Sequence, residues 1–159
     1  MRPEARAAVL ATQNAGIRVV MLTGDQMTTA QALAEQVGIY HEGERVLTGS
    51  DVESMTVEEL SRALDTTTVF ARVTPDHKLK IIQGYKARNE IVAMTGDGVN
   101  DAPALVAADL GIAMGKIGTA VAKEASDIVL LDDNFASIIA AVEEGRSIYH
   151  TTRKVILFL

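Results

Sequence analysis

The sequence contains no cysteine, which excludes disulfide bonds, thiolate metal sites and a cysteine nucleophile. It also lacks a cluster of Lys and Arg. The formal net charge is -6 at pH 7 and the basic residues are scattered, so we expect no nucleic-acid partner. The start of the chain, MRPEARAAVLATQNAG, has charges throughout and no apolar core, unlike a secretory signal. The cytoplasm is therefore the expected compartment of these residues.

A long apolar run is missing as well. The chain closes with KVILFL at residues 154–159, which is far shorter than the roughly 20 apolar residues that cross a bilayer. Two interpretations fit this end: a short docking helix, or the start of a membrane-spanning helix that continues past residue 159. We favour the second, because an amphipathic docking helix would not normally end in an unbroken apolar run such as VILFL.

The chain does contain enough apolar material for one domain, since its 159 residues are 48% hydrophobic. Helical patterns alternate with near-continuous apolar stretches, which are typical of strands covered on both faces. This alternation predicts an α/β fold with a doubly wound parallel sheet. The expected strands are residues 17–22, 68–71, 90–95, 110–114 and 127–131, and the main helices are 26–37, 75–88 and one from about 134.

Signals for the ends of these elements differ in strength. Thr74 is a plausible N-cap and Pro75 suits the first position of the helix at 75–88, while Gly38 can end the helix at 26–37. Residues 40–66 carry weaker patterns. We expect a surface insertion there, with one short helix near 56–64, and find no chemistry in it.

The most unusual stretch is MTGDGVNDAPA at residues 94–104, where Asp97 and Asp101 lie four residues apart in a glycine-containing loop. An apolar strand precedes this loop, and a helix is expected to begin near Asn100 or Asp101. Both carboxylates therefore lie at the carboxyl end of a strand, which is the edge where open α/β sheets bind ligands.

A second turn of this design occurs in RVVMLTGDQMTTA, where Thr23, Gly24 and Asp25 close a strand and open a helix. Backbone amides and a hydroxyl at a helix N-terminus suit a phosphate oxygen. Lys78, in VTPDHKLK, falls in the first turn of a helix and could neutralise a phosphoryl group or pair with an aspartate. Together these features indicate a site for Mg²⁺ and phosphate, because Mg²⁺ usually takes one or two carboxylates plus phosphate and water.

Each piece alone has a plainer interpretation. A TGD turn is most often only a strand-to-helix connection, and a lone lysine in a first turn is most often a solvated surface residue. The segment GKIGTAVAKEA, at residues 115–125, suggests a phosphate loop but lacks the order G-x-x-x-x-G-K-[ST]. The prediction is specific because TGD, TPDHK and GDGVNDAPAL occur together.

These segments resemble the phosphorylation domain of P-type cation-transporting ATPases, members of the haloacid dehalogenase-like superfamily. The resemblance rests on TGD at 23–25, TPDHK at 74–78, TGDGVNDAPAL at 95–105 and DDNFASIIAAVEEGRSIY at 132–149, and covers nearly the whole chain. The last segment is most similar to the type II pumps, and among these to calcium pumps. The resemblance implies Mg²⁺-dependent phosphoryl transfer from ATP to an aspartate, coupled to the transport of a cation.

The resemblance also implies roles for individual residues. Asp97 would coordinate Mg²⁺, Lys78 would offset charge on the transferred group, and Asn100 with Asp101 would organise the phosphate and the lysine. This division of labour suits phosphoryl transfer, which depends mainly on positioning and electrostatic stabilisation. The implied roles are catalysis for Lys78, Asp97 and Asp101, phosphate binding for Thr23, Gly24 and Asn100, and proximity to the nucleotide for Asp25 and Arg72.

The sequence departs from this family in what it does not contain. The motif D-K-T-G-T, which carries the nucleophilic aspartate on the first strand of the domain, occurs nowhere in it. The nucleotide-binding domain, the actuator domain and the membrane helices are missing too. The resemblance implies that these parts belong to the same polypeptide, and that the 159 residues alone are inactive.

The resemblance therefore divides the chain into two parts. Residues 1–147 would form the C-terminal part of the phosphorylation domain, and residues 148–159 a stalk and the truncated start of a transmembrane helix that enters the lipid bilayer. The full-length protein would lie in a membrane with this segment on the cytoplasmic side. Two alternatives stay open: a free-standing phosphatase of the same superfamily, and a non-catalytic module that binds Mg²⁺ or phosphate.

Overall fold

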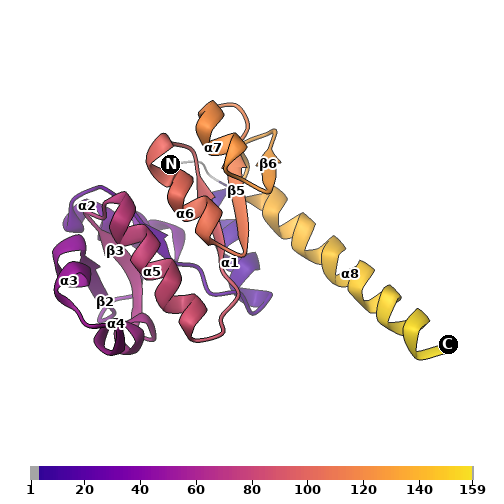
Figure 1. The fold of residues 1–159 in the computed structure, drawn as a ribbon, viewed down its shortest axis with the longest axis horizontal. Helices are drawn as coiled ribbons and strands as arrows, with labels where there is room; N and C mark the ends of the chain where they lie inside the picture. The colour runs from indigo at the N-terminus through magenta and orange to yellow at the C-terminus, as the bar shows by residue number, and fades with distance from the viewer. Residues whose placement is uncertain (1–3, 159) are drawn as a thin grey trace.

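The computed structural model describes residues 4–158, which form two three-stranded sheets with helices on both faces (Figure 1). Every strand pairing in this range is parallel, which confirms the predicted doubly wound α/β class. The continuous sheet that the pattern suggested is divided in two, and the strand expected at residues 17–22 is regular only over its last two residues. In the first sheet the strand order is β1 (Met21–Leu22), β3 (Thr67–Ala71), β2 (Arg45–Thr48). In the second sheet it is β4 (Ala93–Gly96), β5 (Leu110–Met114), β6 (Ile128–Leu130).

The predicted main helices are present with the expected ends. Thr74 caps α5 by accepting a hydrogen bond from the backbone N–H of His77, and Pro75 occupies its first turn. Gly38 ends α2 in the left-handed conformation, with φ of 80°. The helices are α1 (Ala5–Asn14), α2 (Met27–Val37), α3 (Gly49–Ser54), α4 (Val57–Leu64), α5 (Pro75–Ala87), η1 (Val99–Asp101, a 3₁₀ turn), α6 (Ala102–Ala107), α7 (Ala120–Glu124) and α8 (Ala136–Phe158).

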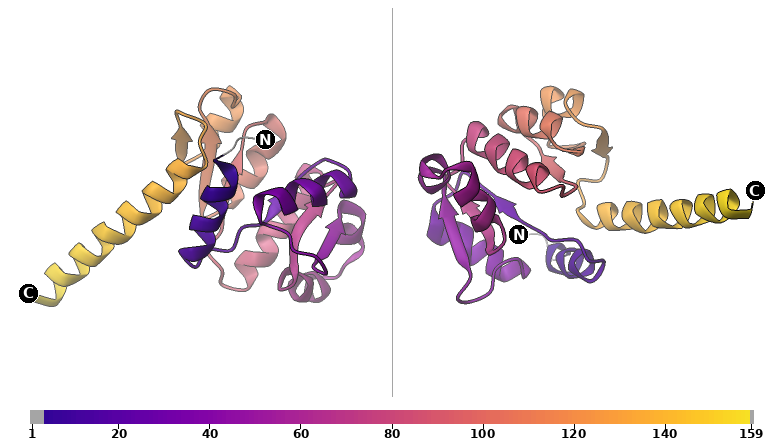
Figure 2. Two further views of the ribbon diagram at one scale, coloured as in Figure 1. Left: turned by 180° about the vertical axis from the view of Figure 1, so that it is seen from behind. Right: turned by 60° about the horizontal axis from the view of Figure 1, so that its bottom comes forward.

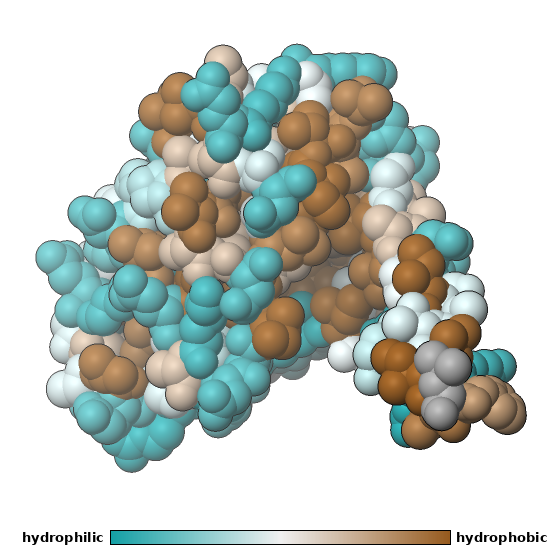
Figure 3. Space-filling model, turned by 45° about the vertical axis from the view of Figure 1, so that its right-hand side comes forward, coloured by the Kyte–Doolittle hydropathy of each residue, from teal (hydrophilic) through white to brown (hydrophobic). Residues whose placement is uncertain are grey.

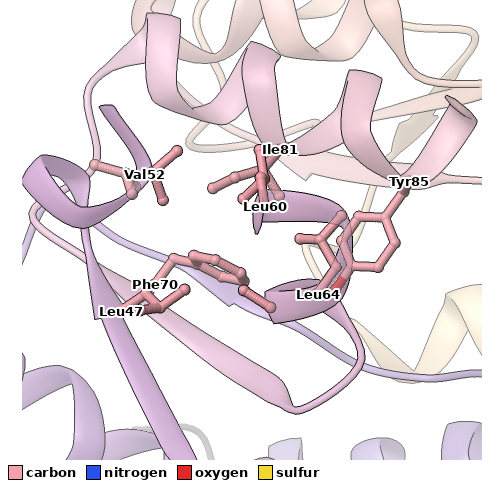
Figure 4. Close-up of a cluster of buried hydrophobic side chains, with 9 residues drawn as sticks. Leu47, Val52, Leu60, Leu64, Phe70, Ile81 and Tyr85 are labelled. Carbon is pink, nitrogen blue, oxygen red and sulfur yellow. The ribbon is translucent and has the colours of Figure 1, made fainter. Parts of the chain in front are cut away.

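The first sheet is buried on both faces, and the alternation along β3 explains how. Phe70 points into a cluster formed with α3, α4 and α5, whereas Val69 and Ala71 point into a cluster with α1 and α2. All three side chains are fully buried. Figure 4 shows Phe70 surrounded by side chains from the strand β2 and the three helices on its side of the sheet.

The segment at residues 40–66 differs from its prediction. The expected helix is present as α4, but the segment also contains the strand β2 and the helix α3. Several of its apolar side chains are core residues: Leu47, Val52 and Leu64 are at most 2% exposed and pack against Phe70 (Figure 4). The description as a surface insertion was therefore wrong, because β2 extends the sheet by pairing with β3.

An apolar cavity separates the two sheets. β1 and β4 are edge strands of their sheets, and both line this cavity of about 450 Å³. Helices α1, α5 and α8 also contribute to its wall, including Tyr85 of α5. The hydroxyl of Tyr85 is buried and has no hydrogen-bond partner within residues 4–158, although buried polar groups are normally paired.

The last helix, α8, runs for 23 residues and projects away from both sheets (Figures 1 and 2). Ile139 is its one buried residue in the described range, and its far end exposes large apolar side chains such as Leu157 and Phe158. Figure 3 shows apolar side chains at this far end and on the face of the body beside the helix. Between residues 4 and 158 no helix is long and apolar enough to cross a bilayer. The predicted membrane segment includes Leu159, outside the described residues, and stays a prediction.

Candidate phosphoryl-transfer site

The loop after β4 is organised by the carboxylate of Asp101. One oxygen, Oδ2, accepts hydrogen bonds from the backbone N–H groups of Gly98 at 3.1 Å and Asp97 at 3.3 Å. The other, Oδ1, accepts a hydrogen bond from Lys78 Nζ at 2.6 Å. Asp101 is 7% exposed, so these contacts replace the water that an ionised carboxylate would otherwise hold.

Gly96, the last residue of β4, allows this arrangement. A Cβ atom at this position would lie 2.5 Å from the Cβ of Asp101, far inside van der Waals contact. At Gly98 the nearest atom to such a Cβ would be 3.6 Å away, which is an ordinary contact. A larger residue at position 96 would therefore clash with the side chain of Asp101, because the strand passes directly against it. A larger residue at position 98 would not.

Lys78 reaches the loop from the first turn of α5, which follows β3. Its ion pair with Asp101 is largely buried, since the two side chains are 14% and 10% exposed. Burial raises the pKa of the Asp101 carboxyl, but the hydrogen bonds and charge supplied by Lys78 and the N–H groups of Gly98 and Asp97 outweigh it and hold that pKa below its ordinary value of 3.8. The Asp101 carboxyl is therefore ionised at neutral pH.

Asp97 contrasts with Asp101. Its residue is exposed, and within residues 4–158 its carboxylate makes no hydrogen bond or ion pair. No three His, Cys, Asp or Glu side chains in that range converge into a group that would hold a metal by itself. A single uncommitted carboxylate still fits Mg²⁺, which usually binds through one or two carboxylates and completes its octahedron with phosphate oxygens and water. Asn100 is exposed on the same loop.

The TGD turn after β1 is held by the turn after β3. The backbone N–H of Thr23 donates to the carbonyl of Phe70, and the N–H of Val73 returns a bond to the carbonyl of Thr23, both at 3.0 Å. Arg72 has φ of 51° and donates its backbone N–H to the carbonyl of Asp25. The structure thus places the two predicted nucleotide-proximal residues side by side through their backbones.

The predicted site residues fall into two groups, one in the turns after β1 and β3 and one formed by Lys78 and the loop after β4. Leu22, next to Thr23, packs against the cluster that contains Met94 and Ile82, so the carboxyl ends of β1 and β4 lie near one another. Within residues 4–158, however, no hydrogen bond or ion pair joins residues 23–25 to Lys78, Asp97 or Asp101. Gly24 and Asp25, in the first group, are exposed.

The sequence did not indicate the part played by residues 115–119. Thr119 donates its backbone N–H to the carbonyl of Asp97 at 2.9 Å, and its hydroxyl caps α7. The glycines at 115 and 118 gave a signal, but as part of a phosphate-loop pattern in the wrong order. The segment instead lies against the Asp97 loop as a backbone support.

Comparison with known proteins identifies the class to which this fold and site belong. The family model described as haloacid dehalogenase-like hydrolase matches residues 1–109. The chain belongs to this haloacid dehalogenase-like hydrolase family. Curated proteins that are similar to this chain include cation-transporting ATPases, which confirms the resemblance to these pumps.

Three of these relatives span bacteria and plants. The chain is 56% identical over 159 residues to the cation-transporting ATPase pma1 of Synechocystis, 50% identical over 158 residues to a calcium-transporting ATPase of Bacillus subtilis, and 50% identical over 162 residues to the endoplasmic reticulum-type calcium-transporting ATPase 3 of Arabidopsis thaliana. Each match covers 99% of this chain but only 18%, 18% and 16% of the relative. The chain therefore spans less than a fifth of the length of these relatives.

A solved structure is similar in fold. It is the catalytic domain of the CPx-ATPase CopB-B, which matches with a TM-score of 0.66 over 89% of this chain and 45% of that one. The two are 24% identical in sequence, a similarity that shows a shared fold.

Proposed function

We propose that these residues form the C-terminal part of the phosphorylation domain of an ATP-driven cation pump, in which a phosphoryl group passes from ATP to an aspartate elsewhere in the polypeptide. The observation that carries the proposal is the buried Lys78–Asp101 ion pair beside the uncommitted carboxylate of Asp97, at the carboxyl edge of a parallel sheet. The similarity to cation-transporting ATPases over 99% of the chain supports it.

Each residue has a physical task in this proposal. Lys78 presents an ammonium to the transferred group, and Asp101 holds both that ammonium and the backbone of residues 97–98 in place. Asp97 would hold Mg²⁺, which when bound supplies positive charge to the phosphoryl oxygens. Thr23, Gly24 and Asn100 would contact phosphoryl oxygens. Asp25 and Arg72 would lie near ATP, where their paired turns face solvent.

The strand that bears the nucleophile would occupy the cavity between the sheets. β1 and β4 both leave one side unpaired there, and unpaired strand edges accept a further strand readily. The lining is mostly apolar, as a central strand of a parallel sheet requires.

This position suits the chemistry. A strand between β1 and β4, parallel to both, would end at the edge that carries Thr23 and Asp97. An aspartate at its carboxyl end would therefore face both halves of the site.

A peptide with the D-K-T-G-T motif and its preceding apolar residues should raise the unfolding temperature of the chain by mass action, whereas a scrambled peptide should not. Equal effects of the two peptides would contradict this placement.

The transported ion and the membrane location belong to the full-length pump. Relatives named as calcium-transporting ATPases support calcium as the transported ion. The full-length protein would lie in a membrane, with the nucleotide-binding domain, the actuator and the membrane helices in the same polypeptide. This segment would be on the cytoplasmic side, and α8 would lead toward the bilayer.

The test is phosphoenzyme formation from ATP by the full-length protein. Asp97→Asn should abolish it, while Glu58→Gln, an exposed carboxylate on α4, should leave it unchanged. Lys78→Ala should slow the transfer by more than about tenfold, or about 1.4 kcal/mol in the barrier. Lys86→Ala is its matched control on the same helix, because Lys86 is 40% exposed. Normal phosphorylation of the Asp97 variant would refute the proposed function.

A further inference from the structure

Asp133 is a buried carboxylate in the turn between β6 and α8. It is 5% exposed and has φ of 54°, a left-handed conformation that Asp, Asn and Gly adopt more readily than other residues. Its two carboxylate oxygens accept hydrogen bonds from the backbone N–H groups of Lys116 at 2.9 Å and Ile117 at 3.0 Å. The carboxylate therefore fixes the backbone of a neighbouring segment through charge-assisted bonds.

The segment that Asp133 holds is tightly packed and leads to the candidate site. A Cβ at Gly115 would lie 2.6 Å from the carbonyl oxygen of Leu130, and one at Gly118 only 2.0 Å from that of Met114. The next residue, Thr119, donates its backbone N–H to the carbonyl of Asp97. Residues 115–119 are thus tied to Asp133 at one end and to Asp97 at the other.

On its other side, Asp133 adjoins the start of α8. Asp132 accepts hydrogen bonds from the hydroxyl of Ser137 at 2.6 Å and from the backbone N–H of Asn134 at 3.1 Å. Asn134 in turn accepts a bond from the N–H of Ala136, the first residue of the helix. The first turn of α8 is therefore linked to Asp97 by the chain itself from Asn134 to Asp133 and by hydrogen bonds through residues 115–119.

We infer that Asp133 is a positioning residue, which fixes the backbone at Asp97 relative to the start of α8. This inference rests on the proposed function, in which Asp97 serves phosphoryl transfer. Packed elements joined by fixed hydrogen bonds move together, so a displacement of α8 at its first turn alters the direction in which Asp97 presents its carboxylate. The residue acts through residues 115–119 and touches neither phosphate nor metal.

Hydrogen exchange in the full-length protein without Mg²⁺ tests the mechanical link. Asp133→Asn and Asp133→Gly both tolerate the left-handed backbone; the first keeps one neutral acceptor oxygen in place of two charged ones, and the second keeps none. Each should speed amide exchange at residues 116–117 and also at 96–101, by roughly tenfold. The control is Asp109→Asn, since Asp109 also accepts a backbone N–H, from Val92 at 2.9 Å, but at the opposite end of the same sheet. That variant should leave exchange at 96–101 within about twofold of wild type.

Two exchange results overturn the inference: faster exchange confined to 116–117, or the same acceleration at 96–101 in the Asp109 variant. The second readout is the Mg²⁺ concentration for half-maximal phosphoenzyme formation, which Asp133→Asn should raise by about tenfold and Asp109→Asn should not. An unchanged Mg²⁺ requirement in the Asp133 variant also overturns it. If instead Asp97→Asn still forms phosphoenzyme, the proposed function fails, and that result is separate from the exchange measurement.

Discussion

Removing the two charges of the Lys78–Asp101 pair, singly and together, tests whether these two buried side chains stabilise the fold through their mutual interaction. Asp101→Asn leaves the ammonium of Lys78 buried without a counter-charge, which costs about 3–5 kcal/mol in comparable pairs. Lys78→Met leaves Asp101 with its two backbone N–H donors, so the loss should be smaller, about 1–3 kcal/mol. The double variant carries neither charge and should lose less than the sum. We expect a coupling energy of about 1.5–3 kcal/mol.

The assay is urea unfolding of wild type, the two single variants and the double variant under one set of conditions. Lys86 and Asp109 provide the matched control pair, at 3.1 Å, because their side chains are 40% and 30% exposed and remain partly solvated. Their coupling energy should stay below about 1 kcal/mol. A coupling energy below about 0.5 kcal/mol for the first pair, or one equal to the control, would refute the claim that burial makes Lys78 and Asp101 a unit.

The same pair predicts a dependence on pH. The pKa of Asp101 is lowered in the folded chain, so its charged form stabilises the fold above the unfolded-state pKa, and this stabilisation is lost as pH falls through the folded-state pKa. The stability difference between wild type and Asp101→Asn should therefore be constant from about pH 6 to 8 and shrink between about pH 5 and 2. A difference that instead shrinks above pH 6 would show that another group is responsible.

Two further substitutions test packing. Gly96→Ala should destabilise the chain by about 1–3 kcal/mol, because its Cβ would displace the side chain of Asp101, whereas Gly98→Ala should cost less than about 1 kcal/mol. Equal losses of unfolding free energy for the two variants, measured in urea, would show that Gly96 is not required by contact with Asp101. Leu64→Ala should cost about 2–5 kcal/mol, since Leu64 is fully buried in the cluster of Figure 4. Val57→Ala, at a 64% exposed position of the same helix, should cost less than about 0.5 kcal/mol, and similar losses for both would restore the interpretation of this segment as a surface insertion.

The elements with strong local signals were predictable from the sequence. The start of α5 follows from a capping Thr74 and Pro75, and the end of α2 from Gly38, because these residues satisfy or end a helix by their own chemistry. Lys78 and Asp101 follow strands of two different sheets, β3 and β4, but both come after the carboxyl end of a strand, where the sequence placed them. Their direct ion pair was one of two interpretations offered for Lys78, and the structure shows that pair.

Features that depend on distant residues were not predictable in this way. β2 offers only Val46 and Leu47 between polar neighbours, so it lacks a strand pattern of its own and forms by pairing with β3. The cavity between β1 and β4 depends on the lateral order of strands, which local periodicity does not encode. Asp133 likewise gave no signal, since its partners are the backbone groups of Lys116 and Ile117 rather than a complementary side chain.

The projecting helix α8 has a mechanical consequence. With 23 residues at about 1.5 Å each, it is a rod of roughly 34 Å. Its first three turns are held by the capping contacts of Asp132 and Asn134 and by the hydrogen bond from Arg146 to the carbonyl of Ala15. The part beyond Arg146, residues 147–158, is about 18 Å long, so a rotation of about 10° where the helix is held sweeps the far end through about 3 Å. The rod therefore converts a shift of a fraction of an ångström at its base into a displacement large enough to change which side chains meet at its tip, and a force applied at the tip returns to the base as torque.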